Sequence, residues 1–218
     1  MKTSLYSVLF ASCIALGVSG CATTNSVYYA GMEKVGFHKR DIMVDRVKGV
    51  QESQKDAQEE FKSALEQFGT LVAIKDSDLK KAYEKFNDEY EDAKEAAEDL
   101  SGRINKLEDV SVALFEEWEE ELKLYSNQKL KTQSEKQLKE TRAKYKKMMS
   151  AMRSSEKSMA PILKTFQDNV LVLKHSLNAQ AIGALQGEFG NLKKEIGGLI
   201  AQMNQSIKAS DAFIQEMR

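Results

Sequence analysis

Apolar residues recur at alternating steps of four and three along most of this 218-residue sequence. The longest run continues over about six heptads. Its members are Leu79, Tyr83, Phe86, Tyr90, Ala93, Ala97, Leu100, Ile104, Leu107, Ser111, Leu114, Trp118 and Tyr125. A stripe with this spacing lies along one side of an α-helix, and it is buried only where another helix packs against it lengthwise. The sequence therefore predicts long helices that pair side by side.

Three further segments repeat this stripe, and residues that favour turns separate the segments. The stripes cover residues 43–71, 138–177 and 182–217, and the breaks lie near 72–77, 126–130 and 178–183. Pro161 is predicted to bend or restart the third helix. No stretch alternates apolar and polar residues as a half-buried strand does. We therefore expect an all-α fold, an elongated antiparallel coiled coil or four-helix bundle of long helices.

Charge favours an antiparallel pairing of the second and third helices. Residues 77–126 hold 16 acids and 7 bases, whereas residues 127–160 hold 10 bases and 3 acids. If the chain folds back between these blocks, Glu119 comes to lie near Lys136 and opposite charges face each other. An alternative interpretation is that the basic block forms an anion-binding face.

The first 20 residues are typical of an export signal. Lys2 precedes an apolar run at 5–18 that contains no acid and is shorter than the roughly 20 residues of a membrane-spanning helix. We expect residues 1–20 to be removed, 21–27 to be a lipidated linker and 28–218 to be a single elongated helical domain.

Cys21 follows this run and could be a disulfide partner, a metal ligand or a thiol nucleophile. The sequence VSGC at 18–21 resembles the lipobox of bacterial lipoproteins. The resemblance implies that Cys21 carries the lipid anchor, whereas the alternative is an ordinary small residue at the end of a signal. Residue 22 is Ala and not the Asp that resembles an inner-membrane retention signal, which favours the periplasmic face of the outer membrane.

Motifs for chemistry are scarce, so we expect no enzymatic activity, cofactor, metal, nucleotide or nucleic-acid partner. The sequence has no GxxxxGK[ST] loop for phosphates. Its two histidines, His38 and His175, fall on different predicted helices, and Cys13 lies within the predicted signal. Four methionines suggest either a copper(I) site or core packing, and their place on the stripe favours the core. They are Met148, Met149, Met152 and Met159.

Residues 28–46 combine aromatic and basic side chains close to the predicted anchor. We expect them to contact lipid headgroups or a partner, and the alternative is a short helix packed on the end of the bundle. The candidate surface consists of Tyr28, Tyr29, Lys34, Phe37, Lys39, Arg40 and Arg46.

The stretches YYAGMEKVGFHKRDIMVDRV at 28–47 and QEEFKSALEQF at 58–68 resemble a family of uncharacterised proteobacterial lipoproteins. That domain of unknown function covers essentially the whole mature chain and implies no activity. Similar chains are sometimes labelled DNA-repair ATPase, but the missing phosphate loop and the export signal argue against that label. We expect a lipid-anchored periplasmic scaffold or interaction protein that associates with another envelope component or with itself. The alternative is a peripheral protein that binds anionic lipid.

Overall fold

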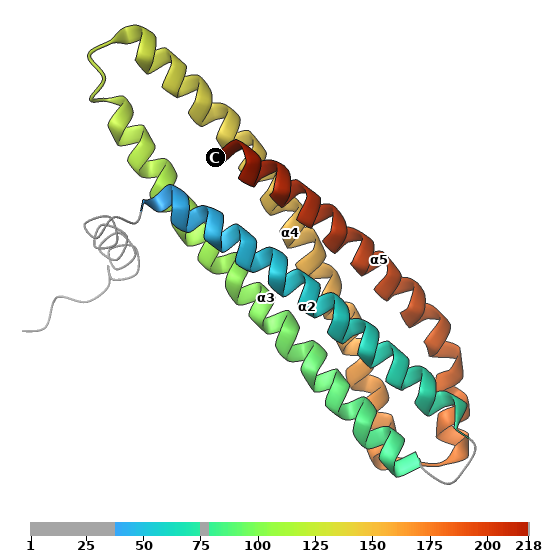
Figure 1. The fold of residues 1–218 in the computed structure, drawn as a ribbon. Helices are drawn as coiled ribbons and strands as arrows, with labels where there is room; N and C mark the ends of the chain where they lie inside the picture. Colours follow the sequence, from blue (N-terminus) through green and yellow to red (C-terminus); the bar gives the residue numbers. More distant parts are fainter. Residues whose placement is uncertain (1–37, 75–78, 218) are drawn as a thin grey trace, which may run out of the picture.

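Four long helices run back and forth in the computed structural model, which describes residues 38–74 and 79–217. They are α2 (Lys39–Ala73), α3 (Leu79–Leu122), α4 (Gln128–His175) and α5 (Ala179–Met217). Each helix packs against the next, and α2 also packs against α5, so the helices form a closed ring (Figure 1). No strand occurs in the two described ranges. The predicted all-α bundle of long antiparallel helices is confirmed.

The predicted stripes form the core of the bundle. Every stripe residue of α2, from Met43 to Leu71, is buried, and so is every stripe residue of α3 from Phe86 to Leu114. Phe61 has no accessible surface, and burial of one such side chain contributes about 1.5–3 kcal/mol. All four methionines of the predicted core set on α4 are buried as well.

A polar layer interrupts the core where α2, α4 and α5 meet. Gln54 is fully buried, and its Nε2 donates to Ser155 Oγ at 3.1 Å and to Ser206 Oγ at 3.0 Å. Gln51 Nε2, one turn earlier, donates to Asp211 Oδ1 at 2.8 Å. A buried polar side chain is satisfied only when its partners arrive in one register. These bonds therefore fix how far α2 and α5 slide past each other.

Aromatic side chains fill the end of the bundle at which α2 leads into α3. The ring of Phe86 lies between those of Phe68 and Phe166, with centroids 5.0 Å and 5.7 Å away. Gly69 faces Phe189 so closely that an added Cβ would lie 2.7 Å from the ring. Glycine at position 69 therefore allows α2 and α5 to approach each other at this level.

One helix end differs from the prediction. Helix α3 ends at Leu122, and Tyr125 lies in the turn with 41% of its surface exposed. The prediction that Tyr125 belongs to the apolar stripe is therefore wrong. The third helix continues through Pro161 without restarting. Within the described ranges, no helix has the length and apolar character needed to span a bilayer.

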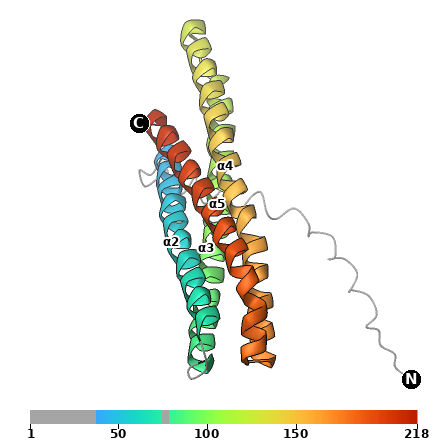
Figure 2. The ribbon, with the colours of Figure 1, turned by 90° about the vertical axis from the view of Figure 1, so that its right-hand side faces the viewer.

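The α3–α4 hairpin extends beyond the other two helices. Lys39, the first residue of α2, contacts Glu117, and Met217, the last residue of α5, lies beside Glu117 and Thr141. Past this level α3 and α4 continue as a pair, as both views show (Figures 1 and 2). We call Trp118–Glu140 the hairpin tip and the remainder of the bundle the four-helix body.

Candidate interaction surfaces

The predicted lipidation site and the first half of the predicted surface lie outside the described residues. These residues are Cys21, Tyr28, Tyr29, Lys34 and Phe37. Their roles stay predictions, and the described chain begins at His38, at the same end of the bundle as the hairpin tip.

The three remaining bases of the predicted surface do not form one patch. Lys39 is only 8% exposed, and its Nζ lies 2.9 Å from Glu117 Oε1. Arg46 is half-buried, and its Nε makes no hydrogen bond within the described part of the chain. Arg40 is exposed, and about 100° of helix rotation per residue places it on a different side from Arg46. The expectation that Lys39 belongs to an open basic surface is therefore wrong.

The hairpin tip exposes three large apolar side chains around its turn. Leu124 is 82% exposed, Leu130 is 50% exposed and Tyr125 is 41% exposed. The ten residues 122–131 also contain three lysines and no acid. The tip is thus apolar and basic at its extremity, a combination that the sequence analysis missed because Tyr125 was assigned to the core stripe.

Local hydrogen bonds hold this turn in a defined shape. Asn127 caps α4, because its Oδ1 accepts from the backbone nitrogens of Lys129 at 3.0 Å and Leu130 at 3.3 Å. The backbone nitrogen of Leu124 donates to Glu121 O at 2.9 Å at the end of α3. Behind the turn, Trp118 Nε1 donates to Ser134 Oγ at 2.9 Å and joins the two helices.

Arginines, rather than the predicted lysines, carry the ion pairs between α3 and α4. Arg142 pairs with Glu119 and lies over the ring of Phe115, 5.1 Å from its centroid. Arg153 reaches Glu108 of α3 at 2.5 Å and also pairs with Glu156 of its own helix at 2.9 Å.

Glu119 and Lys136, which were expected to lie near each other, form no ion pair. Lys136 Nζ lies instead 3.9 Å from Glu140 Oε1 of its own helix. The antiparallel direction predicted from charge is nevertheless confirmed.

Burial alone would lower the pKa of Arg153, but the hydrogen bonds of its guanidinium to Glu156 and Glu108 outweigh burial and raise that pKa.

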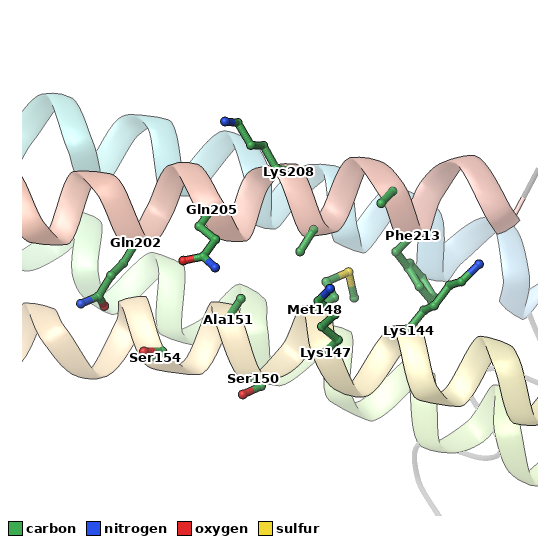
Figure 3. Close-up of a pocket in the computed structure, with 12 residues that line it drawn as sticks. Lys144, Lys147, Met148, Ser150, Ala151, Ser154, Gln202, Gln205, Lys208 and Phe213 are labelled. Carbon is green, nitrogen blue, oxygen red and sulfur yellow. The ribbon is translucent and has the colours of Figure 1, made fainter.

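An open groove of about 670 Å³ lies between α4 and α5 on the four-helix body (Figure 3). Small side chains, including Ala151 and Ala209, leave the space, and the buried side chains of Met148 and Phe213 form its floor. Lysines stand along it, and Lys144 also pairs with Glu216. The groove could accept an apolar side chain from an acidic partner. Its lining contains lysine, serine and glutamine but neither histidine nor carboxylate, so it offers no acid–base pair.

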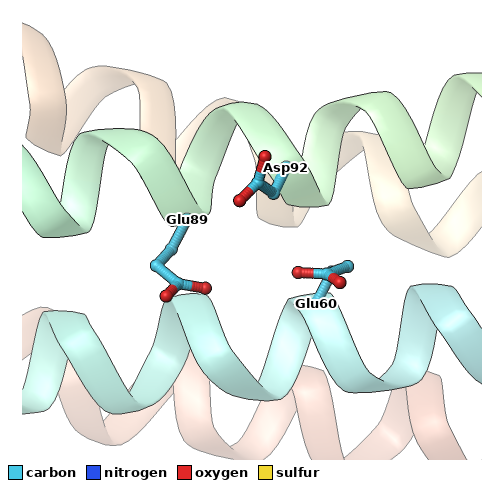
Figure 4. Close-up of side chains that lie close together, drawn as sticks. All are labelled: Glu60, Glu89 and Asp92. Atoms are coloured by element: carbon cyan, nitrogen blue, oxygen red, sulfur yellow. The ribbon is translucent and has the colours of Figure 1, made fainter.

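Three carboxylates meet between α2 and α3, and sequence analysis did not anticipate them (Figure 4). Oxygens of Glu60, Glu89 and Asp92 all lie within 4.8 Å of one another. Burial and then the charges of Asp92 and Glu89 raise the pKa of Glu60. Carboxylate oxygens are ligands for Ca²⁺ and Mg²⁺. Asp92 is exposed and the other two are half-buried, so water screens this group as it does other surface acids.

The histidines are far from this acidic group and from each other. His38 precedes α2 at the tip end, and His175 ends α4 at the opposite end, with both side chains exposed. Among the described residues, the three carboxylates are the one group of at least three side chains with metal-ligand spacing.

Comparison with known proteins gives one similarity. Neither a curated protein nor a solved structure matches the chain. The family described as "Protein of unknown function (DUF2959)" matches residues 28–217, which include all four helices. Since the match covers most of the sequence, the chain belongs to the DUF2959 family, whose function is unknown.

Proposed function

We propose that this protein is a lipid-anchored interaction protein of the cell envelope, held at the periplasmic face of the outer membrane through Cys21. Its helical body acts as a scaffold, and its work is contact with another envelope component rather than catalysis. The export signal and the lipobox-like VSGC sequence support the location. The filled core and the open grooves support a role in binding, because a catalytic site needs polar groups that converge in a pocket.

One observation carries the proposal: exposed apolar side chains gather at the hairpin tip. Leu124, Tyr125 and Leu130 lie within seven positions of one another around one turn. They lie at the end of the bundle where the described chain begins, 17 positions after Cys21. Apolar side chains that a protein leaves together in water mark a contact site. The proposed anchor and the proposed contact therefore lie at the same end.

Two measurements in intact cells test the proposal. Metabolic labelling with a palmitate analogue should mark the wild-type chain, and Cys21→Ser should abolish both the label and outer-membrane fractionation. A photoreactive phenylalanine analogue at position 124 should give adducts with an envelope component. The matched control is the same analogue at Leu171, which is 45% exposed near the opposite end of α4. An unlabelled wild-type chain, or equal adducts at both positions, would contradict the proposal.

A further inference from the structure

We infer that the hairpin tip docks on an anionic phospholipid surface. This inference rests on the proposed function only in that the anchor would bring the tip close to a bilayer. The apolar side chains reach between the headgroups, and the surrounding lysines bind lipid phosphates. The residues concerned are Leu124, Tyr125 and Leu130, with Lys123, Lys129 and Lys131.

The apolar part of the tip suits a bilayer better than a protein. Its three exposed side chains offer far less than the roughly 800 Å² that each partner buries in a standard protein–protein interface. A bilayer makes no such demand, because leucine gains free energy at any depth below the headgroups and tyrosine prefers the interface itself. Leu124 precedes the capping residue Asn127 and Leu130 follows it, so an exposed leucine flanks the turn on each side.

The charges around the turn, at residues 122–131, are complementary to anionic lipid, whereas the hairpin tip as a whole holds five lysines and five acids. Lys129 and Lys131 make no ion pair within the described ranges, and no acid lies between positions 122 and 131. Lys123 pairs with Glu120 at 2.5 Å, but both side chains are largely exposed, so water weakens this pair. The cap at Asn127 holds the start of α4 in place. Lysines therefore surround the leucines at the turn, and the nearest carboxylates, Glu120 and Glu121, lie at the end of α3.

The position of the tip also suits a surface near the anchor. From Glu117 to Tyr125 the hairpin projects by roughly 12 Å at 1.5 Å per residue. The 17 residue steps between Cys21 and His38 can span at most about 60 Å. The linker is thus long enough for the tip to reach the bilayer that holds the anchor. Within the described residues, α2 and α5 both stop short of the tip, so neither blocks the approach.

Photocrosslinking to lipid tests the inference directly. The full chain, purified from membranes, is reconstituted in phosphatidylcholine vesicles with and without phosphatidylglycerol. The photoreactive analogue replaces Leu124, or Leu171 as the matched control, and lipid adducts are measured by mass spectrometry. We expect adducts at position 124 several times more often than at 171, and more often with phosphatidylglycerol. Equal adduct formation at the two positions would overturn the inference.

Lysine variants test the electrostatic half of the inference. Lys129→Gln with Lys131→Gln should lower the ratio of docked to undocked tip about 25-fold on anionic vesicles, about five-fold per lysine. Lys146→Gln with Lys157→Gln, which removes two exposed lysines of the body, should leave the ratio unchanged. High salt should also release the tip, since the screening length falls to about 3 Å at 1 M. If the tip and control variants give equal ratios, anionic lipid is not what the tip recognises.

The inference and the proposed anchor can fail separately. Lipid adducts at position 124 on a chain whose Cys21 carries no acyl label would refute the anchor and support the docking. A labelled Cys21 without such adducts would support the anchor and refute the docking. Adducts in intact cells that contain a protein and no lipid would also refute the docking.

Discussion

The four-helix body and the hairpin tip share α3 and α4, yet their packing differs. In the body, Phe61 and Phe166 are fully buried because neighbours cover them from several helices. In the tip, Leu122 and Leu138 keep 9% and 6% of their surface exposed, and Trp118 is only partly buried. A second layer of helices therefore turns a partly covered stripe into a closed core. It follows that the tip can open locally while the body stays folded.

The largest expected effect comes from emptying the core of the body. Phe166→Ala removes a fully buried ring that contacts Phe86 edge-on, and should lower the free energy of unfolding by about 3–5 kcal/mol. Leu138→Ala in the tip should cost about 2 kcal/mol, because water and neighbouring side chains refill part of the space. Urea unfolding followed by circular dichroism measures both. An equal or larger loss for Leu138→Ala would contradict the comparison.

The polar layer gives the next effect, and it lies entirely in the body. Gln54→Ala removes two buried hydrogen bonds and leaves a space, so we expect a loss of about 1–3 kcal/mol in the same urea experiment. Gln54→Leu should lose less, because it fills the space and removes Oε1, which has no hydrogen bond within the described residues. If leucine is the more damaging of the two substitutions, the space around position 54 does not accept a branched apolar side chain, and the prediction from packing is wrong.

The two capped turns allow a matched test of local opening. Asn127 caps α4 at the tip, and Asn178 accepts from the backbone nitrogen of Ala181 at 3.0 Å at the other end of the bundle. Replacing either by alanine should weaken its cap by about 1 kcal/mol. Hydrogen exchange in the tip should then speed up about five-fold for Asn127→Ala, with the body unchanged. Asn178→Ala should leave the tip unaffected, and faster exchange throughout the protein in either variant would show that tip and body open together.

The smallest effect concerns charge on the body. Because burial and nearby carboxylates raise the pKa of Glu60, the folded protein binds that proton more tightly than the unfolded chain does. The resulting stabilisation is present below the ordinary pKa of the group and is lost as pH rises through the folded value.

Glu60→Gln should therefore raise the melting temperature slightly at pH 7, and the gain should vanish in acid. Glu52→Gln, at an exposed position on the same helix, serves as the control. A gain that persists in acid would show that the charge of Glu60 is not its cause.

The heptad pattern predicted most of the fold because helix pairing is a local property repeated many times. Each stripe residue of α2 is where its spacing placed it, and Trp118 packs against the core as expected although it is partly exposed. Spacing does not tell where a second layer of helices stops. Tyr125 continues the spacing of the stripe, but Asn127 begins a new helix and leaves Tyr125 in the turn.

Charge blocks predicted the direction of pairing but not the partners. The direction in which two helices pair depends on the net charge of long segments. An individual contact depends on how far each side chain reaches and on which side of the helix it lies. Arg142 meets Glu119 because its guanidinium can cross the seam over Phe115, and Lys136 points along its own helix toward Glu140. The group of three carboxylates around Glu60 was not predicted from the sequence for the same reason, since its members come from two helices.

The ring of helices also has a consequence for the order in which the chain folds. Between α3 and α4, hydrogen-bonded residues are 16 positions apart at Trp118 and Ser134 and 55 apart at Ser101 and Glu156. The bonds between α2 and α5 join residues 114 to 160 positions apart. Closing a loop ten times longer costs about 2 kcal/mol more entropy. The hairpin thus zips from its turn, and the α2–α5 seam closes last, once the C-terminal helix has been synthesised.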